Sequence, residues 1–382
     1  MSDAPILVSD LRPQIAALRP EFDAAVKRVL DRGWFILGEE GRAFETEFAA
    51  FLGARHVVGV ANGTDAIHLA LRAVGIRPGD PVLLPPSTAN PTACAVTALG
   101  AVPCFADVEP DTGLFQAAAL EEAMARLRPR AVIPVHLYGR PERMTSLLAL
   151  AAKHGVAVIE DVAQAHGAPL DCGGVAGTRG AIGCFSFYPS KNLGAFGDGG
   201  ALSTEDPELA EALRRLRNYG QADRYHHVSF GLNSRLDELQ AAFLRVKLPH
   251  LATANDARRA IVARYREALR DLPLALPSDD PSAASSVHHL FVVRVTRRDS
   301  FREALRQRGI GTEIHYPVPI HRQEAYAGLG LGPGSFPVAE RRAAQIVSLP
   351  LYPELQATQI DRVIDAVRAA LSGHPHPDEE TA

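Results

Sequence analysis

The chain has 382 residues, a net charge of -4, 47% hydrophobic residues and 22% charged residues. These values are ordinary for a soluble globular protein, and the length favours one large and one smaller domain. They argue against a nucleic-acid binder, since no basic block stands out, and no apolar run is long enough to span a membrane.

Strand-like apolar runs alternate with helical periodicity from residue 56 to about residue 205. The predicted strands are His56–Val60, Pro81–Leu84, Val102–Ala106, Ala131–His136, Val156–Glu160, Ile182–Phe187 and Gly200–Thr204. The predicted helices between them include Ala66–Val74, Leu120–Leu127, Met144–His154 and Glu208–Arg217. This alternation implies crossover connections and a mostly parallel sheet with helices on both faces, so the predicted fold class is α/β.

The last third of the chain has an α+β pattern. Helical periodicity from Asp237 to about Leu272 is interrupted at Pro249, so we predict two helices that meet there. After a Pro-, Asp- and Ser-rich loop at Pro273–Ser286, the predicted strands are Val287–Val295 and Thr312–His315, and the predicted helices are Ser300–Arg308, Ala339–Ile346 and Gln359–Leu371. We therefore expect a large domain at residues 1–250 and a small C-terminal domain at residues 251–382, with a disordered tail at residues 373–382.

Two segments thirty residues apart indicate the chemistry. Lys191 lies among small, aromatic and turn-forming residues in Phe185–Gly194, which is not typical of a surface lysine. Asp161 ends the apolar run that begins at Val156, where a buried parallel strand opens into a loop, and ligand sites of open α/β sheets lie at that strand end. An amine nucleophile and a buried acid are the two groups that pyridoxal phosphate needs, one for a Schiff base and one to keep the ring nitrogen protonated.

Neighbouring residues fit the same cofactor. Gln164, three residues after Asp161, offers an amide for the ring hydroxyl if the chain turns helical there. The segment Asn62–Ala66 follows a predicted strand and opens a helix, as phosphate-binding segments do. Taken alone, an ordinary helix cap explains this segment better, and Asp161 could equally be a strand-end turn residue. Ser186 strengthens the phosphate interpretation, because its hydroxyl could close a cup just before Lys191.

Other site types fit less well. The glycines of Gly197–Gly200 and Cys172–Gly174 do not form a dinucleotide-binding fingerprint. The pairs His226-His227 and His288-His289 lack metal-ligand spacing, so we expect no metal. The N-terminus has no secretory signal and the four cysteines show no paired spacing, which favours the cytoplasm. The polar aromatic residues of His315–Pro317, followed by His321, suit sugar recognition.

Together these motifs resemble the DegT-type family of pyridoxal-phosphate-dependent sugar-nucleotide aminotransferases of fold type I. The resemblance covers nearly the whole chain and is carried by Gly63–Ala66, Glu160–Gly167, Ser186–Gly194, Gly197–Gly200, Arg217–Gly220, Asn233–Ala242, Glu313–Pro317 and Ser348–Pro353. It implies that Lys191 bonds to pyridoxal 5'-phosphate and moves the proton, that Asp161 pairs with the ring nitrogen and that Gln164 meets the ring hydroxyl. It also implies a set of phosphate-binding residues: Gly63, Thr64 and Ser186.

The resemblance further implies a homodimer with shared active sites, in which Asn233 reaches the phosphate of the neighbouring subunit's cofactor. The candidate contacts to the nucleotide sugar are Tyr188, Arg235, His315, Tyr316 and His321. One position departs from the family, because Ala89 stands where an aromatic residue usually stacks on the cofactor ring. Either another residue stacks there, or that face of the ring is open.

The region from Arg217 to Ala242 looks most like enzymes that aminate C3 of a dTDP-linked 3-keto-6-deoxyhexose with glutamate as amino donor. Amination at C4, or of a UDP-linked sugar, is the main alternative. A sugar 3-dehydratase of this family would have histidine in place of Lys191. A non-catalytic nucleotide-sugar sensor should have lost Lys191 or Asp161, and this chain has both.

Overall fold

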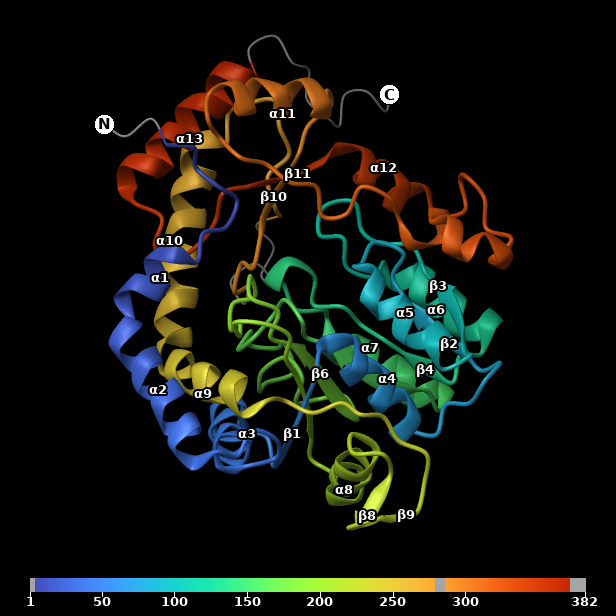
Figure 1. The fold of residues 1–382 in the computed structure, drawn as a ribbon. Coiled ribbons are helices and arrows are strands. Elements are labelled where there is room, and N and C mark those ends of the chain that lie inside the picture. The colour runs from blue at the N-terminus through green and yellow to red at the C-terminus, as the bar shows by residue number, and fades with distance from the viewer. Residues whose placement is uncertain (1–3, 279–285, 372–382) are drawn as a thin grey trace.

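A computed structural model describes residues 4–278 and 286–371 (Figure 1). Its centre is a seven-stranded sheet in the order β1-β7-β6-β5-β4-β2-β3. The strands are β1 (His56–Val60), β2 (Pro81–Leu84), β3 (Val102–Phe105), β4 (Ala131–Val132), β5 (Ala157–Asp161), β6 (Ile182–Ser186) and β7 (Gly200–Thr204). Strands β2 to β6 pair in parallel, while β7 runs antiparallel to β1 and β6. The predicted mostly parallel α/β sheet is confirmed.

Two hydrophobic cores cover the two faces of this sheet. Successive residues of a strand point to opposite faces, so Val57 belongs to one core and Val58 to the other. The helices that pack on the first face are α3 (Glu39–Leu52), α6 (Ala117–Leu127), α7 (Met144–His154) and α9 (Glu238–Lys247). Those on the second face are α4 (Gly63–Ala73), α5 (Asn90–Ala98) and α8 (Pro207–Leu216).

A third core lies in the upper part of Figure 1. It is built from α10 (Leu251–Leu269), β10 (Phe291–Arg294), α11 (Arg298–Gln307), β11 (Ile346–Leu349) and α13 (Ala357–Ala370). The predicted domain boundary at residue 250 stays a prediction. Two segments pack against the core on the other side of this boundary. Ile6 is buried in this third core, whereas Ile320 and Tyr326 are buried against the central sheet. The expected tail at residues 373–382 lies outside the described residues.

The structure also shows where the predicted elements differ. As predicted, the helices α9 and α10 are separated at Pro249, by the 3-10 turn Leu248–His250. The predicted strand Val287–Val295 is only β10, and Thr312–His315 forms no strand, because Glu313 makes a single bridge to Ser348. The helix predicted to end at Ile346 is α12 (Pro337–Gln345), since Ile346 pairs into β11.

Four helices were not predicted: α1 (Arg12–Ala17), α2 (Arg19–Arg32), α3 and α5. Helix α5 follows a Pro- and Ser-rich run that is typical of a loop, and Pro91 in its first turn is compatible with a helix. Beyond α8, the hairpin of β8 (Gln221–Asp223) and β9 (His226–His227) projects at the bottom of Figure 1.

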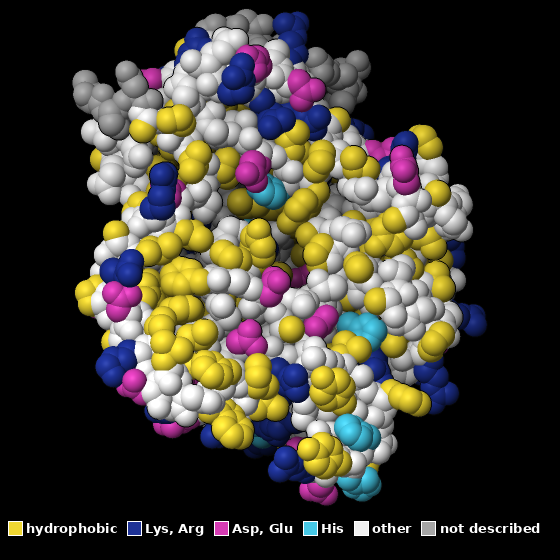
Figure 2. Space-filling view, in the orientation of Figure 1, with side chains coloured by type: hydrophobic (Ala, Val, Ile, Leu, Met, Phe, Trp, Pro, Cys, Tyr) yellow, Lys and Arg dark blue, Asp and Glu magenta, His cyan; other side chains and the backbone are white. Residues whose placement is uncertain are grey.

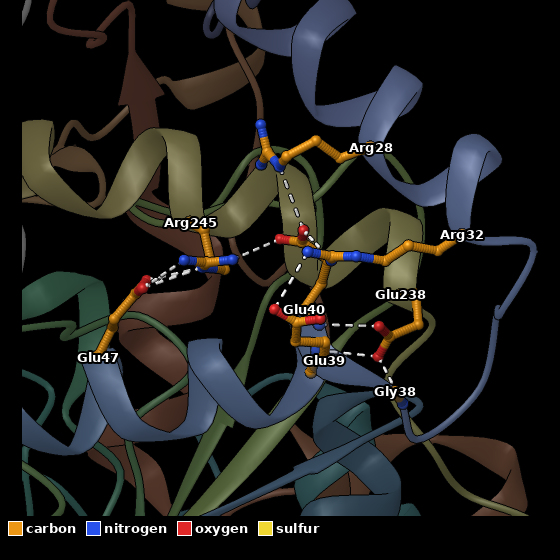
Figure 3. A network of polar contacts seen from close by, with 9 residues as sticks. Arg28, Arg32, Gly38, Glu39, Glu40, Glu47, Glu238 and Arg245 are labelled. Carbon is orange, nitrogen blue, oxygen red and sulfur yellow. Dashed lines mark hydrogen bonds and ion pairs between the residues drawn. The ribbon is translucent and has the colours of Figure 1, made fainter.

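Ion pairs to the buried carboxylate of Glu40 link α2 and α3 to α9 (Figure 3). The Glu40 carboxylate is 1% exposed and lies 2.9 Å from Arg32 and 2.6 Å from Arg245. Glu238, the first residue of α9, accepts hydrogen bonds from the backbone N–H groups of Gly38, Glu40 and Gly41 at 2.8–2.9 Å. It thereby satisfies donors that the start of α3 leaves without intrahelical partners.

Candidate active site

The predicted cofactor residues lie at one edge of the sheet. Asp161 is the last residue of β5, Ser186 is the last residue of β6, and Gly63 begins the helix that follows β1. Strands β1, β5 and β6 run in the same direction, so these three residues meet at the carboxyl end of the sheet. Ligands bind at this end in open α/β folds.

Gly63 and Ser186 form a close contact at the start of α4. A Cβ atom on Gly63 would lie 2.7 Å from the Cβ of Ser186, so a larger residue would not fit without movement. The Asn62 side chain caps α4 by accepting a hydrogen bond from the Asp65 N–H at 2.8 Å. Glycine at a capped helix start leaves backbone N–H groups open to an anion. Thr64 follows as the second residue of the helix and is half-buried.

Asp161 is buried and accepts two hydrogen bonds. Its Oδ1 accepts from the backbone N–H of Ala163 at 3.1 Å, and its Oδ2 accepts from the Thr92 hydroxyl at 2.8 Å. The Thr88 hydroxyl oxygen lies 3.1 Å from that of Thr92. Neither Thr88 nor Thr92 was predicted as a site residue.

Lys191 interacts electrostatically with this carboxylate. Burial lowers the pKa of the Lys191 amine to about 8, and the negative charge of Asp161 opposes that shift. The backbone N–H of Lys191 donates to the carbonyl of Tyr188 at 2.8 Å, which closes a tight turn around the lysine. A buried amine with a lowered pKa is neutral near pH 7 more often than an ordinary lysine is. The neutral amine is the form that attacks an aldehyde.

Two buried imidazoles flank Lys191. Burial lowers the pKa of His166 to about 3, and the Lys191 charge adds to the shift. Burial lowers the pKa of His289 well below its ordinary value, again with help from Lys191. Both rings are therefore neutral at pH 7. Of these three buried groups, Lys191 has the pKa nearest to neutral pH.

Gln164 connects three parts of the site. Its Oε1 accepts from the backbone N–H of Tyr138 at 2.6 Å, and its Nε2 donates to the Tyr316 hydroxyl at 2.9 Å. The chain after Asp161 forms turns instead of a helix, so the helical spacing considered for Gln164 was wrong. The turn still brings Gln164 beside Tyr316, which the sequence pattern had placed only in a distant loop.

A cavity of about 410 Å³ opens beside the lysine turn. It is lined by residues from the N-terminal segment, the lysine turn and the C-terminal third, among them Ser9, Tyr188, Ser190, His289, Glu313 and His315. The His315 ring is held by the Ser348 hydroxyl at 2.8 Å, and the Tyr138 hydroxyl donates to its carbonyl. Two predicted substrate residues, Tyr188 and His315, therefore border one cavity.

The remaining predicted residues have other neighbours in this chain. Asn233 is exposed and pairs through its backbone with Asn218, whose side chain accepts a hydrogen bond from Arg235 at 2.9 Å. His321 is 1% exposed, and its Nε2 lies 3.0 Å from Glu340. Substrate roles for Arg235 and His321 stay predictions.

Side-chain amides that sequence analysis missed hold the lysine turn. The Asn192 Nδ2 donates to the Asn255 Oδ1 at 2.8 Å and to the Val287 carbonyl at 2.9 Å. Asn255 in turn donates to the His166 carbonyl at 3.0 Å. Asn192 could have been noticed because it follows the lysine, whereas Asn255 lies inside α10 with no distinguishing pattern.

The profile of the DegT/DnrJ/EryC1/StrS aminotransferase family matches residues 16–368. The chain belongs to this family. It is 49% identical over 360 residues, 94% of each chain, to dTDP-3-amino-3,4,6-trideoxy-alpha-D-glucose transaminase of Streptomyces venezuelae. It is 48% identical to UDP-N-acetyl-3-dehydro-alpha-D-glucosamine 3-aminotransferase of Acidithiobacillus ferrooxidans, with 95% of this chain and 97% of that one covered.

Solved structures of aminotransferases agree in fold. S. venezuelae DesV in complex with a ketimine intermediate matches with a TM-score of 0.92 and 48% identity, over 96% of this chain and 98% of that one. Bacillus subtilis NtdA with bound cofactor PMP matches with a TM-score of 0.86 and 30% identity, over 92% and 82% of the two chains. The predicted DegT-type family, fold type I and pyridoxal-phosphate-dependent aminotransferase activity are confirmed.

The site of this DegT/DnrJ/EryC1/StrS aminotransferase fits pyridoxal 5'-phosphate. Gly63 has no side chain between the start of α4 and Ser186, so the backbone N–H groups there stay open to a phosphate. The Asp161 carboxylate has lone pairs that Thr92 and Ala163 do not use. Ala89 is the N-cap residue of α5, and its backbone is extended. Because alanine has no ring, position 89 cannot stack on the cofactor.

Across residues 4–278 and 286–371, no helix combines the length and apolar character needed to cross a membrane. The same residues contain no group of three or more His, Cys, Asp or Glu side chains that could hold a metal ion.

Proposed function

We propose that this enzyme transfers the amino group of L-glutamate to C3 of a dTDP-linked 3-keto-6-deoxyhexose. One observation carries the proposal: the Lys191 amine is buried, its pKa is lowered to about 8 and it interacts with the charge of Asp161, while Tyr188 and Ser190 of the lysine turn border a cavity of about 410 Å³. Cavities of this size hold small-molecule ligands. All four cysteines are free thiols, which suits a reducing compartment such as the cytoplasm.

The names of relatives support amination at C3. The S. venezuelae relative and the Aneurinibacillus thermoaerophilus dTDP-3-amino-3,6-dideoxy-alpha-D-galactopyranose transaminase, 44% identical, both carry dTDP and a 3-amino group in their names. The A. ferrooxidans relative has the same carbon on a UDP sugar. A UDP-linked 3-keto sugar is therefore the second candidate substrate.

Each predicted residue has a task in this reaction. When bound, the cofactor supplies an electron sink for the α-carbon of the amino donor. With the cofactor bound, Asp161 would pair with the ring nitrogen, Gln164 would lie at the ring hydroxyl, and Lys191 would carry the proton of the donor's α-carbon. The phosphate is held by Gly63, Thr64 and Ser186. The nucleotide sugar enters past Tyr188, His315 and Tyr316.

We propose that the active unit is a homodimer with shared sites, in which Asn233 serves the phosphate of the neighbouring subunit. Large apolar side chains near Asn233 support this, since Phe230 is 90% exposed and Tyr225 is 80% exposed. Figure 2 shows further apolar side chains over α1, α2 and α9. Trp34, two residues beyond the end of α2, is 64% exposed. Exposed apolar surface of this kind is typical of protein interfaces.

Transfer of nitrogen from 15N-labelled glutamate tests the proposal. The enzyme should place 15N in the dTDP-linked 3-keto sugar, with slower or no transfer to dTDP-linked 4-keto and UDP-linked 3-keto sugars. Faster transfer to a UDP-linked sugar would make the second candidate the function. Lys191→Ala is the control and should transfer none.

The other alternative, a non-catalytic sensor, does not agree with the match to an aminotransferase family. Two relatives have regulatory names: the Erythromycin biosynthesis sensory transduction protein EryC1 of Saccharopolyspora erythraea, 46% identical, and a Pleiotropic regulatory protein of Geobacillus stearothermophilus, 40% identical. Lys191 and Asp161 favour the enzyme.

A further inference from the structure

Two threonines, Thr92 in α5 and Thr88 just before that helix, form a chain of hydroxyls to the carboxylate at the end of β5. Thr92 is 1% exposed and Thr88 is 2% exposed. The Thr92 Oγ1 lies 2.8 Å from the Asp161 Oδ2 and 3.1 Å from the Thr88 Oγ1. Both oxygens are therefore shielded from bulk water, and the contact spans 69 positions of sequence.

Chemistry gives this chain of hydroxyls a direction. An ionised carboxylate only accepts hydrogen bonds. The single hydroxyl hydrogen of Thr92 must therefore be directed at Asp161, and so Thr88 donates to Thr92. The Asp161 Oδ1 has a separate donor, the backbone N–H of Ala163. Each carboxylate oxygen thus has one protein donor, which orients the carboxylate plane.

Another threonine on the same helix shows the alternative that Thr92 does not take. The Thr97 hydroxyl donates to the carbonyl of Ala93 at 3.2 Å, four residues earlier, as threonines inside helices commonly do. Thr92 instead contacts the hydroxyl of the residue four positions earlier and the carboxylate of another element. Its hydroxyl is therefore not needed to satisfy the backbone of α5.

Little space beside Thr88 is open to water. The cavity that borders Thr88, together with Tyr138 and Tyr316, is about 10 Å³. A water molecule needs at least roughly 10–15 Å³ of such space and two or more polar partners. Valine has nearly the shape of threonine, so Thr92→Val would open no new room and would leave Asp161 Oδ2 without its side-chain donor.

We propose that Thr92, oriented by Thr88, is a positioning residue that holds the Asp161 carboxylate in the plane needed by the cofactor's ring nitrogen. This inference rests on the proposed function for the role of Asp161. Thr92 itself touches neither substrate nor the reacting atoms, and acts through Asp161. Lys191, Tyr316 and Cys184 are the titratable groups whose pKa values also depend on the charge of Asp161.

The test compares threonine-to-valine changes on one helix in the cofactor-loaded enzyme. Thr92→Val should lower kcat about tenfold or more, on the scale of one hydrogen bond to a charged group, and leave the KM for glutamate within about twofold. The pH midpoint of the bound cofactor's visible absorbance should shift by roughly half a unit or more. Thr92→Ser keeps the hydroxyl and should restore both properties.

Two further variants give the test its controls. Thr97→Val, at the same helix, should keep kcat and the absorbance midpoint within about twofold and a tenth of a unit of the wild type. Thr88→Val removes only the outer donor and should shift both properties in the same direction as Thr92→Val, but less. It also decides the matter if Thr92→Val does not fold.

Several results would overturn the inference. One is a wild-type absorbance midpoint and kcat in folded Thr92→Val; another is an equal loss in Thr92→Val and Thr97→Val, or no recovery in Thr92→Ser. If only Thr88→Val folds, wild-type behaviour in that variant overturns it. Failure of the proposed function is a separate outcome, because the wild-type enzyme would then transfer no 15N to any sugar while the absorbance shifts remain measurable.

Discussion

Burial makes the Lys191 amine a nucleophile close to neutral pH. With a pKa of about 8, roughly a tenth of the Lys191 side chains are neutral at pH 7, against well under a thousandth for an ordinary lysine. The neutral fraction rises with pH and levels off above the pKa. In cofactor-free protein, the rate at which pyridoxal phosphate and borohydride label Lys191 should therefore rise about tenfold per unit below pH 8 and become flat above pH 9.

Peptide mapping checks this prediction. Lys153 on α7, with a 66% exposed side chain, is the control and should label slowly. Lys247 is a sharper comparison, because burial lowers its pKa to about 8 too, but its amine donates to the Gly194 carbonyl at 2.8 Å. A label on Lys247 in place of Lys191, or a rate that keeps rising above pH 9, would contradict the assignment.

The charge of Asp161 matters more than its shape. Asp161→Asn keeps the size of the side chain and removes the negative charge that faces the ring nitrogen. We expect kcat to fall at least ~10²-fold, the scale of losing one preorganised electrostatic contact. Stopped-flow measurement of the half-reaction with glutamate gives the rate. Asp171→Asn, an exposed change in the loop that follows, should leave it unaltered, and a near-normal rate in Asp161→Asn would show that the acid is only a turn residue.

Helix α3 depends on a side chain from α9 for its first turn. Glu238 is 2% exposed and accepts hydrogen bonds from three backbone N–H groups of residues 38–41. Glu238→Ala leaves these donors without that acceptor, so the free energy of unfolding should fall by about 2–4 kcal/mol, the cost of several unpaired buried polar groups reduced by local relaxation. Urea unfolding at one fixed protein concentration measures the change.

Glu39→Ala is the matched control for this helix. Glu39 is the first residue of α3, but its side chain is 64% exposed and pairs with Arg32 at 3.1 Å. Exposed ion pairs contribute at most about 1 kcal/mol. Equal losses in the two variants would mean that the Glu238 hydrogen bonds do not hold α3.

Mixed dimers test whether two chains share each site. Lys191→Ala and Asn233→Ala should each be inactive or strongly impaired alone. If Asn233 serves the neighbouring subunit, a mixed dimer has one site with both defects and one with neither. Random reassortment makes half of the dimers mixed, so about a quarter of all sites become intact and activity should rise towards that fraction. With subunit exchange proven by mass spectrometry, no recovery would mean that Asn233 serves its own chain.

Local pattern was enough for the architecture and for the reacting groups. Apolar runs of strand length predicted the strands along the chain from His56 to Thr204. Side chains that are buried on both faces of a sheet leave such continuous apolar runs. Lys191 and Asp161 were found because a lysine in an apolar turn and an acid at a strand end are unusual by themselves. Such signals are local, so they can be read without the fold.

Packing alone decided which groups surround these two residues. Thr92 meets Asp161 across 69 positions, Gln164 meets Tyr316 across 152 positions, and Glu238 caps a helix about 200 positions earlier. Short apolar helices such as α5 were missed for a related reason, since burial against the sheet stabilises them more than their own sequence does. A hydrogen bond requires two atoms within about 3 Å, and no spacing along the chain specifies that distance between separate elements, so only the tertiary structure determines it.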